Sequence, residues 1–290
     1  MSNIQLVSSR RGSGPALVVI RQLDREGWAP VIDLLARERE VVAVDLPGFG
    51  DSPPLPDGTT PTVHALAAEV ARWFSTAGLT RPPVAGNSLG GAVALELART
   101  GAVSNAVALS PIGLWTGPEA AYALGSLRVA RMMAESLGGR TARVTGNPLG
   151  RTLAFWQLVA RPWQMTPAAA DGALRNLARS PGFEATRRAA HNYRLRGFAP
   201  GVPVTVAWGT RDLLTPLHQA RRATRLLPGP VICGCPAAGT PPCPTIPAAS
   251  PTSCCPRAAA EVRGLGRRPP VGPSGPAESR TRPAGSPPGS

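Results

Sequence analysis

Short apolar runs alternate with amphipathic stretches along the chain. The apolar runs are typical of strands in a buried sheet, and we expect strands at residues 4–7, 16–20, 41–44, 82–85, 105–109 and 204–208. Apolar residues at helical spacing separate them and predict helices at residues 28–37, 62–77, 92–98 and 218–227. Strands that alternate with helices predict an α/β fold, with a mainly parallel sheet covered by helices on both faces.

The pattern changes in the middle of the chain. Between residues 119 and 195 only helical periodicity occurs, and we expect helices at residues 120–136, 152–160, 168–178 and 183–193. We therefore expect a helical cap at residues 113–200, inserted between two parts of one core at residues 1–112 and 201–229.

The composition changes again near Gly229. All five cysteines lie at or after Cys233, whereas every tryptophan, phenylalanine and tyrosine lies before residue 230. A segment without aromatic residues and rich in proline, glycine and serine buries too little apolar surface to offset its ordering entropy. We expect a disordered tail at residues 230–290, which would leave the strand at 204–208 at an uncovered sheet edge. The cysteines lack a nearby histidine and a paired C-x-x-C, so we expect no metal site.

The formal charge of +14 is carried by arginine alone, because the chain has no lysine. The arginines are scattered and no recognition motif accompanies them, so we interpret them as a solvated surface and expect no nucleic-acid partner. Nucleic-acid binding remains an alternative that rests on charge only. Residues 1–11 lack the apolar core of a signal peptide, and no apolar run is long enough to span a membrane. We expect a cytoplasmic protein with no membrane partner.

The stretch that carries chemistry is Gly86-Asn87-Ser88-Leu89-Gly90-Gly91. It places the pattern Gly-x-Ser-x-Gly between a predicted strand and a predicted helix, as in a nucleophile elbow. A serine on such a sharp turn needs small residues two positions before and after it. The turn would present the Ser88 hydroxyl at a helix N-terminus, where the Leu89 N–H could stabilise an oxyanion. A chance match in a glycine-rich chain is the alternative.

Four features in chain order resemble the α/β-hydrolase family. They are the D-x-P-G-x-G-x-S loop at residues 45–52, the elbow at 86–91, the helical insertion after Ser110-Pro111, and the strand and loop at 206–212. The resemblance covers residues 1–229 and implies a triad of Ser88 as nucleophile, Asp212 as the orienting acid, and a later histidine as base. It implies no cofactor, and it implies a structural role for Asp45. Asp212 as the N-cap of the next helix is the alternative.

The chain departs from the family's pattern in two places. After the strand at 16–20 the family has His-Gly, whereas this chain has Arg21-Gln22-Leu23. The second oxyanion donor would come from Gln22 or Leu23, and the bulk of Gln22 in place of glycine alters that loop. The family's histidine belongs on a loop beyond residue 230, but the histidines here are His64, His191 and His218.

A shifted reading frame would explain the absent histidine. If the possible codons of residues 230–247 are read one base earlier, they permit a strand followed by Gly-Cys-Gly-His-Thr-Pro, which is similar to the family's histidine loop. We therefore interpret residues 230–290 as an out-of-frame translation of a hydrolase tail.

These features predict a serine hydrolase that acts on a small ester, thioester or related acyl compound. Trp115, Trp156 and Trp163 of the cap would supply an apolar substrate pocket, or would pack within the cap itself. The alternative function is a catalytically inactive remnant of the hydrolase fold.

Overall fold

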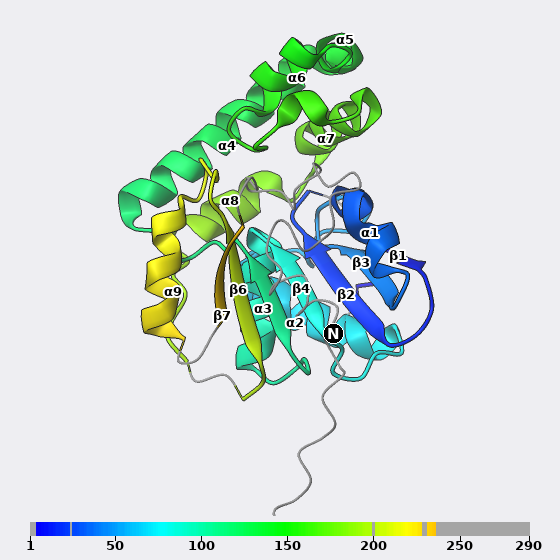
Figure 1. Ribbon diagram of the computed structural model, residues 1–290, viewed down its shortest axis with the longest axis vertical. Coiled ribbons are helices and arrows are strands. Elements are labelled where there is room, and N and C mark those ends of the chain that lie inside the picture. The colour runs from blue at the N-terminus through cyan, green and yellow to red at the C-terminus, as the bar shows by residue number, and fades with distance from the viewer. Residues whose placement is uncertain (1–3, 24, 199–200, 228–230, 236–290) are drawn as a thin grey trace, which may run out of the picture.

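The protein is described by a computed structural model over residues 4–23, 25–198, 201–227 and 231–235, the last segment as backbone only. These residues form a seven-stranded sheet in the order β1-β3-β2-β4-β5-β6-β7 (Figure 1). Its first strand pairs antiparallel with β3, and the other strands pair in parallel. The bounds are β1 Ser8–Arg11, β2 Ala16–Arg21, β3 Glu40–Asp45, β4 Val84–Asn87, β5 Ala106–Leu109, β6 Val204–Gly209 and β7 Val231–Cys235.

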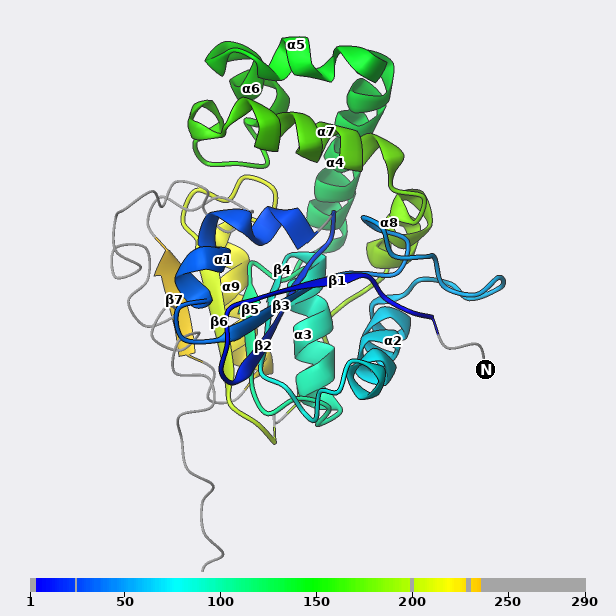
Figure 2. The same cartoon turned by 90° about the vertical axis from the view of Figure 1, so that its right-hand side faces the viewer.

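Alternating side chains of the central strands enter two separate cores. In β2, Val18 and Ile20 join the core on the side of helices α2 (Val63–Thr76) and α3 (Leu89–Arg99). Leu17 and Val19 join the core on the side of α1 (Ala29–Leu35), which the 3₁₀ turn η1 (Arg25–Trp28) precedes. Because successive side chains in a strand point to opposite faces, an all-apolar strand requires cover on both sides. Figure 2 shows the helices on the two faces of the sheet. The mainly parallel α/β architecture is therefore as predicted.

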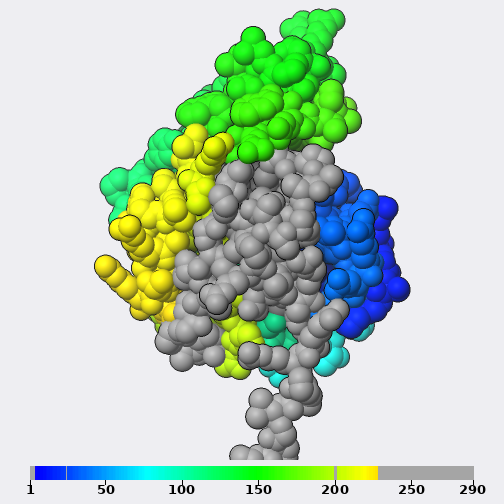
Figure 3. Space-filling view, viewed as in Figure 1, coloured from blue at the N-terminus to red at the C-terminus, as the bar shows by residue number. Residues whose placement is uncertain are grey.

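A group of helices lies over one end of the sheet (Figures 1 and 2), and the same group stands at one end of the space-filling view (Figure 3). We call this group the cap. Three of its helices begin at polar caps: Thr116 and Glu119 form a capping box, and the Asn147 and Thr166 side chains accept N–H groups of the following turn. The bounds are α4 Gly117–Leu137, α5 Thr141–Thr145, α6 Pro148–Phe155, α7 Pro167–Arg179 and α8 Phe183–His191, with 3₁₀ turns η2 Gly138–Arg140 and η3 Pro162–Gln164. The chain then returns to the core through β6, η4 (Leu217–Gln219) and α9 (Ala220–Leu226).

The strand expected at residues 4–7 is wrong, because β1 begins at Ser8. The Val7 N–H donates to the Ser52 hydroxyl at 2.8 Å, and the Val7 carbonyl accepts the Asp45 N–H at 3.0 Å. Val7 therefore bonds to the end of β3 and to the loop after it, but residues 4–7 form no strand of their own. The short helix α5 was not predicted from the sequence.

The expectation of disorder from residue 230 is wrong for residues 231–235. They form β7, which pairs in parallel with β6 from Thr205 opposite Val231 to Gly209 opposite Cys235. A sheet edge offers a row of unpaired backbone groups, and the β-branched pair Val231 and Ile232 favours an extended partner there. The edge of β6 is consequently covered. The rest of the predicted tail, residues 236–290, lies outside the described residues.

Candidate active site

Ser88 lies alone between the last residue of β4 and the first residue of α3. Its backbone has φ 55° and ψ −115°, a conformation that costs energy for any residue with a side chain. Backbone hydrogen bonds on both sides hold this turn. The Ser88 N–H donates to the Leu109 carbonyl at 2.9 Å, and the Ser88 carbonyl accepts the N–H groups of Ala92 and Ile112.

Glycines flank the turn because there is no room for a Cβ. A Cβ on Gly86 would lie 2.0 Å from the Gly90 carbonyl oxygen, and one on Gly90 would lie 2.3 Å from the Ile20 carbonyl oxygen. Both neighbours are backbone atoms, which cannot rotate away. The steric argument made from Gly-x-Ser-x-Gly therefore holds in the structure.

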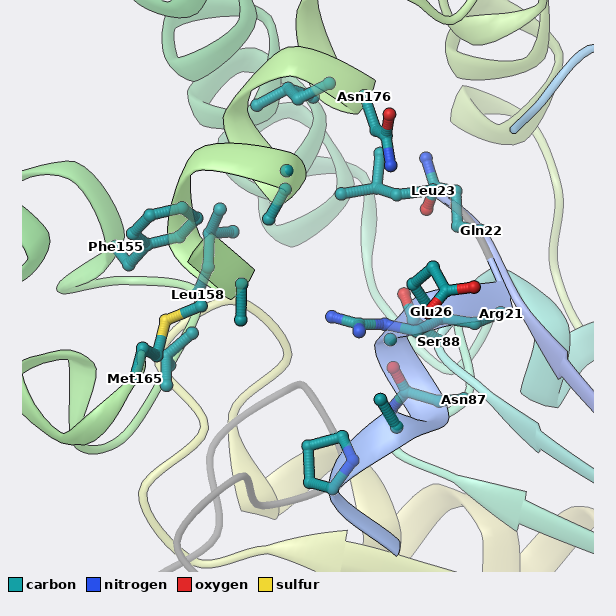
Figure 4. A pocket seen from close by; sticks show the side chains of 18 of the residues that line it. Arg21, Gln22, Leu23, Glu26, Asn87, Ser88, Phe155, Leu158, Met165 and Asn176 are labelled. Atoms are coloured by element: carbon teal, nitrogen blue, oxygen red, sulfur yellow. The ribbon is translucent and has the colours of Figure 1, made fainter. Parts of the chain in front are cut away.

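A cavity of about 640 Å³ opens at Ser88, between the core and the cap (Figure 4). The core supplies a polar floor from the ends of β2 and β4, with Arg21, Gln22, Asn87 and Ser88. The cap supplies a mainly apolar wall, which includes Leu127, Phe155, Leu158, Val159, Met165 and Leu177. Such a combination suits a ligand with a polar group at Ser88 and an apolar body toward the cap.

The expected oxyanion residues lie around Ser88. Gln22 and Leu23 line the cavity, and Leu89 lines a small adjoining cavity together with Ser88 and Gln22. As the first residue of α3, Leu89 has an N–H without an acceptor inside the helix, at the positive end of the helix dipole. The Leu23 carbonyl accepts the Gly50 N–H at 3.1 Å, which ties this loop to the loop after β3.

Asp45 anchors the loop that carries Gln22 and Leu23. Its buried carboxylate accepts the N–H groups of Arg25 at 2.6 Å and Asp51 at 3.1 Å and forms an ion pair with the Arg25 guanidinium. Burial raises the pKa of Asp45, and these hydrogen bonds oppose the shift without cancelling it. Asp45 lines neither cavity that opens at Ser88, and its contacts hold the backbone of the two neighbouring loops in place.

Asp212 is buried in the loop that follows β6. One carboxylate oxygen accepts the N–H groups of Leu214 at 3.0 Å and Thr215 at 2.8 Å, and the other accepts the Thr215 hydroxyl at 2.8 Å. The residue that precedes the following 3₁₀ turn is Pro216, so Asp212 organises its own loop and does not cap a helix. Leu214 of this loop lines both cavities with Ser88, which brings the loop to the site.

All three histidines of the chain are among the described residues. His218 Nε2 contacts the Glu119 carboxylate, and His64 Nε2 lies 3.5 Å from Glu96 Oε1. His191 is exposed at the last position of α8. Neither cavity that Ser88 lines has a histidine in its described lining.

The tryptophans expected in the pocket are placed differently. Trp156 and Trp163 are 58% and 47% exposed and line neither cavity, so these two expectations are wrong. Phe155, one position earlier in the chain, points into the cavity, and a helical rotation of about 100° per residue turns its neighbour outward. Trp115 is buried, donates its Nε1–H to the Tyr193 carbonyl at 3.1 Å, and lines only the small adjoining cavity.

Sequence reasoning did not single out Arg21 as a site residue, although it lines the cavity. The available signal was its position directly after the apolar run at residues 16–20, at the carboxyl end of an expected strand. Within the described ranges there is no group of three or more His, Cys, Asp or Glu side chains that could hold a metal ion. No helix in this part of the chain is both long and apolar enough to span a bilayer.

Comparison with known proteins identifies the fold family. A family model described as alpha/beta hydrolase fold matches residues 15–233. A putative carbamate hydrolase RutD of Escherichia coli O6:H1 is 30% identical over 215 residues, which cover 70% of this chain and 73% of that protein. The acetyltransferase component of the acetoin cleaving system of Cupriavidus necator is 29% identical over 77% of this chain, and the chain spans 59% of that longer relative.

Solved structures share the fold at lower identity. An esterase from Thermogutta terrifontis superimposes with a TM-score of 0.64 at 22% identity, over 82% of this chain and 87% of the esterase. The enol-lactonase of Burkholderia xenovorans LB400 gives a TM-score of 0.62 at 20% identity, over 79% and 87% of the two chains. The family match over most of the chain, the sheet order and the glycine-flanked Ser88 agree, and the protein belongs to the α/β-hydrolase fold family.

Proposed function

We propose that the cavity at Ser88 is the acyl site of a serine hydrolase for small esters, thioesters or related acyl compounds. The observation that carries this proposal is the strained elbow, which places Ser88 at the floor of a cavity with an apolar wall. A folded chain keeps such a conformation only where its surroundings enforce it, and such strain clusters at functional sites. The relatives named for carbamate, ester and lactone hydrolysis support the same class of reaction.

In this reaction the Ser88 oxygen attacks the acyl carbon and loses its proton to a base. The Leu89 N–H and an N–H of the loop at Gln22 or Leu23 stabilise the oxyanion. The intermediate collapses, the leaving group departs with a proton, and water then releases the acid and restores the hydroxyl. Asp212 would orient the base, as the resemblance implies.

The described residues place no histidine base in the lining of the cavity. His64 lies near Glu96, and His218 contacts Glu119. His191 is exposed, and none of the three histidines lines the cavity. A serine hydroxyl without a base within hydrogen-bond reach is a poor nucleophile at neutral pH. We therefore expect acylation only by strongly activated reagents and no efficient turnover of ordinary esters.

The second candidate is a binding protein that keeps the acyl site without the reaction. The positions of the three histidines favour it, because none of them lines either cavity at Ser88. Under this candidate the cavity binds acyl compounds and Ser88 stays unmodified.

A fluorophosphonate probe separates the two candidates. We expect slow labelling of the protein at Ser88, located by peptide mass spectrometry, no labelling of S88A, and hydrolysis of p-nitrophenyl butyrate about 10⁴-fold or more below that of an intact triad enzyme. No labelling of a folded protein would favour the binding candidate. Rapid ester hydrolysis that S88A abolishes would show that another group serves as base.

A further inference from the structure

Helix α6 presents apolar side chains to the outside of the cap. Leu149, Leu153 and Trp156 follow one another at intervals of four and three residues, and side chains at this spacing share one face of a helix. We call these three residues the outer face of α6. The two leucines are 68% and 66% exposed. Arg151 is buried on the opposite face, where its guanidinium donates to the Trp163 carbonyl at 3.1 Å. A helix that contacts only water on its outside has the reverse arrangement.

The outer face of α6 takes no part in the candidate active site. None of its three residues is in the described lining of either cavity at Ser88. Figures 1 and 2 show α5 and α6 at the end of the cap that lies farthest from the sheet. Because monomeric proteins rarely expose apolar side chains in groups, an apolar face at a protruding end indicates a contact surface.

The segment that carries this face has only positive charges. Between Glu135 and Asp171 the chain has arginines at positions 140, 143, 151 and 161 and no acidic residue. Arg140 and Arg143 are exposed in η2 and α5, directly before α6. A second copy of this chain would bring the same arginines to the contact and would be repelled. A negatively charged surface would be attracted, so the charge selects an anionic partner.

We propose that the outer face of α6 binds to an anionic lipid surface, with Arg140 and Arg143 at the level of the headgroups. An interfacial helix of this kind buries its apolar side chains about 5–10 Å deep, at the boundary of headgroups and acyl chains. Tryptophan is favoured at that depth because its ring is apolar and its N–H is polar, and each arginine near the surface adds attraction. The expectation of no membrane partner rests on the lack of a spanning run, and binding to a membrane surface needs none. This inference is independent of the proposed function.

Vesicle flotation with the full chain tests the proposal. One set of vesicles is phosphatidylcholine alone, and the other is phosphatidylcholine and phosphatidylglycerol in equal parts. We expect the protein to bind the anionic vesicles about tenfold or more tightly than the neutral ones, and to bind them less tightly in high salt.

Two pairs of variants assign the binding to α6. We expect L149S/L153S to weaken binding to the anionic vesicles about tenfold or more, whereas L213S/L217S, which replaces two exposed leucines of the core, should bind as the parent does. R140Q/R143Q should lose most of the preference for anionic vesicles. R221Q/R225Q removes the same charge from exposed positions of α9 and should keep that preference.

Three results would overturn the proposal. The first is that the folded parent does not bind the anionic vesicles. The second is equal binding by L149S/L153S and the parent at the same melting temperature, because charge alone would then account for the binding. The third is a dimer of the parent that L149S/L153S dissociates, without binding to vesicles, which would assign the outer face of α6 to a second copy.

Discussion

At the scale of single residues, the position of Ser88 is determined by backbone atoms. Its N–H donates to the last residue of β5, and its carbonyl accepts from Ala92 in α3 and from Ile112 after β5. Gly86 and Gly90 lack the side chains that would obstruct the bend. Ser88 therefore keeps its place independently of any base. Loss of a histidine would consequently leave the elbow intact.

Gly90 should be among the least replaceable residues of the core. A Cβ there would lie 2.3 Å from the Ile20 carbonyl oxygen, so we expect G90A to lower the free energy of unfolding by about 1–3 kcal/mol. Gly125 in α4 is the matched control, because a Cβ there meets nothing within 4 Å and G125A should stabilise the helix by up to about 1 kcal/mol. Urea unfolding of the two variants measures both. Equal effects would show that the close approach at the elbow is unimportant.

At the scale of elements, contacts with the core fix the two ends of the cap. At its start, Arg222 of α9 donates to the Leu114 carbonyl at 2.7 Å and pairs with Glu119 of α4, which His218 also contacts. Near its end, the Tyr193 hydroxyl donates to Glu96 of α3 at 3.0 Å. The apolar wall that faces Ser88 therefore depends on polar contacts at its margins.

The start of α4 should make stability depend on acid. Burial acts to raise the pKa of Glu119, but hydrogen bonds from Arg222, His218 and Thr116 outweigh it and lower the pKa below its ordinary value of 4.5. A carboxyl group with a lowered folded-state pKa stabilises the fold above pH 4.5, and this contribution is lost as the pH falls below that value.

We expect E119Q to lower the free energy of unfolding by about 1–2 kcal/mol at pH 7 and to flatten its decline in acid. E135Q on the same helix is the control, because Glu135 forms an exposed pair with Arg131 that should contribute about 0.5 kcal/mol or less. Urea unfolding from pH 3 to pH 8 measures both variants. If E119Q and E135Q have the same pH profile, the contacts of Glu119 do not secure the cap.

The sequence predicted the elements whose signals are local. The apolar run Val41–Val44 requires packing on both faces, and it lies in β3 as predicted. The elbow glycines are required because a side chain would clash with the backbone, and the structure shows this close approach. The outward orientation of Trp156 could not be predicted, because the neighbours of α6 decide which of its faces is buried. The strand β7 was not predicted, because the composition after residue 229 argued that this segment could not form a core. A segment of five residues needs no core of its own, since it can pair with the edge of an existing sheet.

At the scale of the whole molecule, the parallel sheet gathers the site at one end. Arg21, Ser88 and Asp212 follow or end β2, β4 and β6, and parallel strands present their carboxyl ends at the same edge. The strand β7 ends at Cys235 opposite Gly209 of β6, so its carboxyl end lies beside the strand that leads to Asp212. A histidine loop after β7 would start at this edge, but no histidine follows Cys235 in the sequence.

The proposed shift in reading frame predicts that restoring the frame completes the triad of serine, histidine and aspartate. Restoring the frame from the Gly229 codon would put Gly-Cys-Gly-His-Thr-Pro after a final strand, and we expect ester turnover to rise by about 10⁴-fold or more. The gain should disappear when the restored histidine is replaced by alanine, and in S88A, while the melting temperature stays that of the restored chain. An intact frame in the sequenced gene, or a folded restored chain that is no faster on p-nitrophenyl butyrate, would mean that the missing base has another cause.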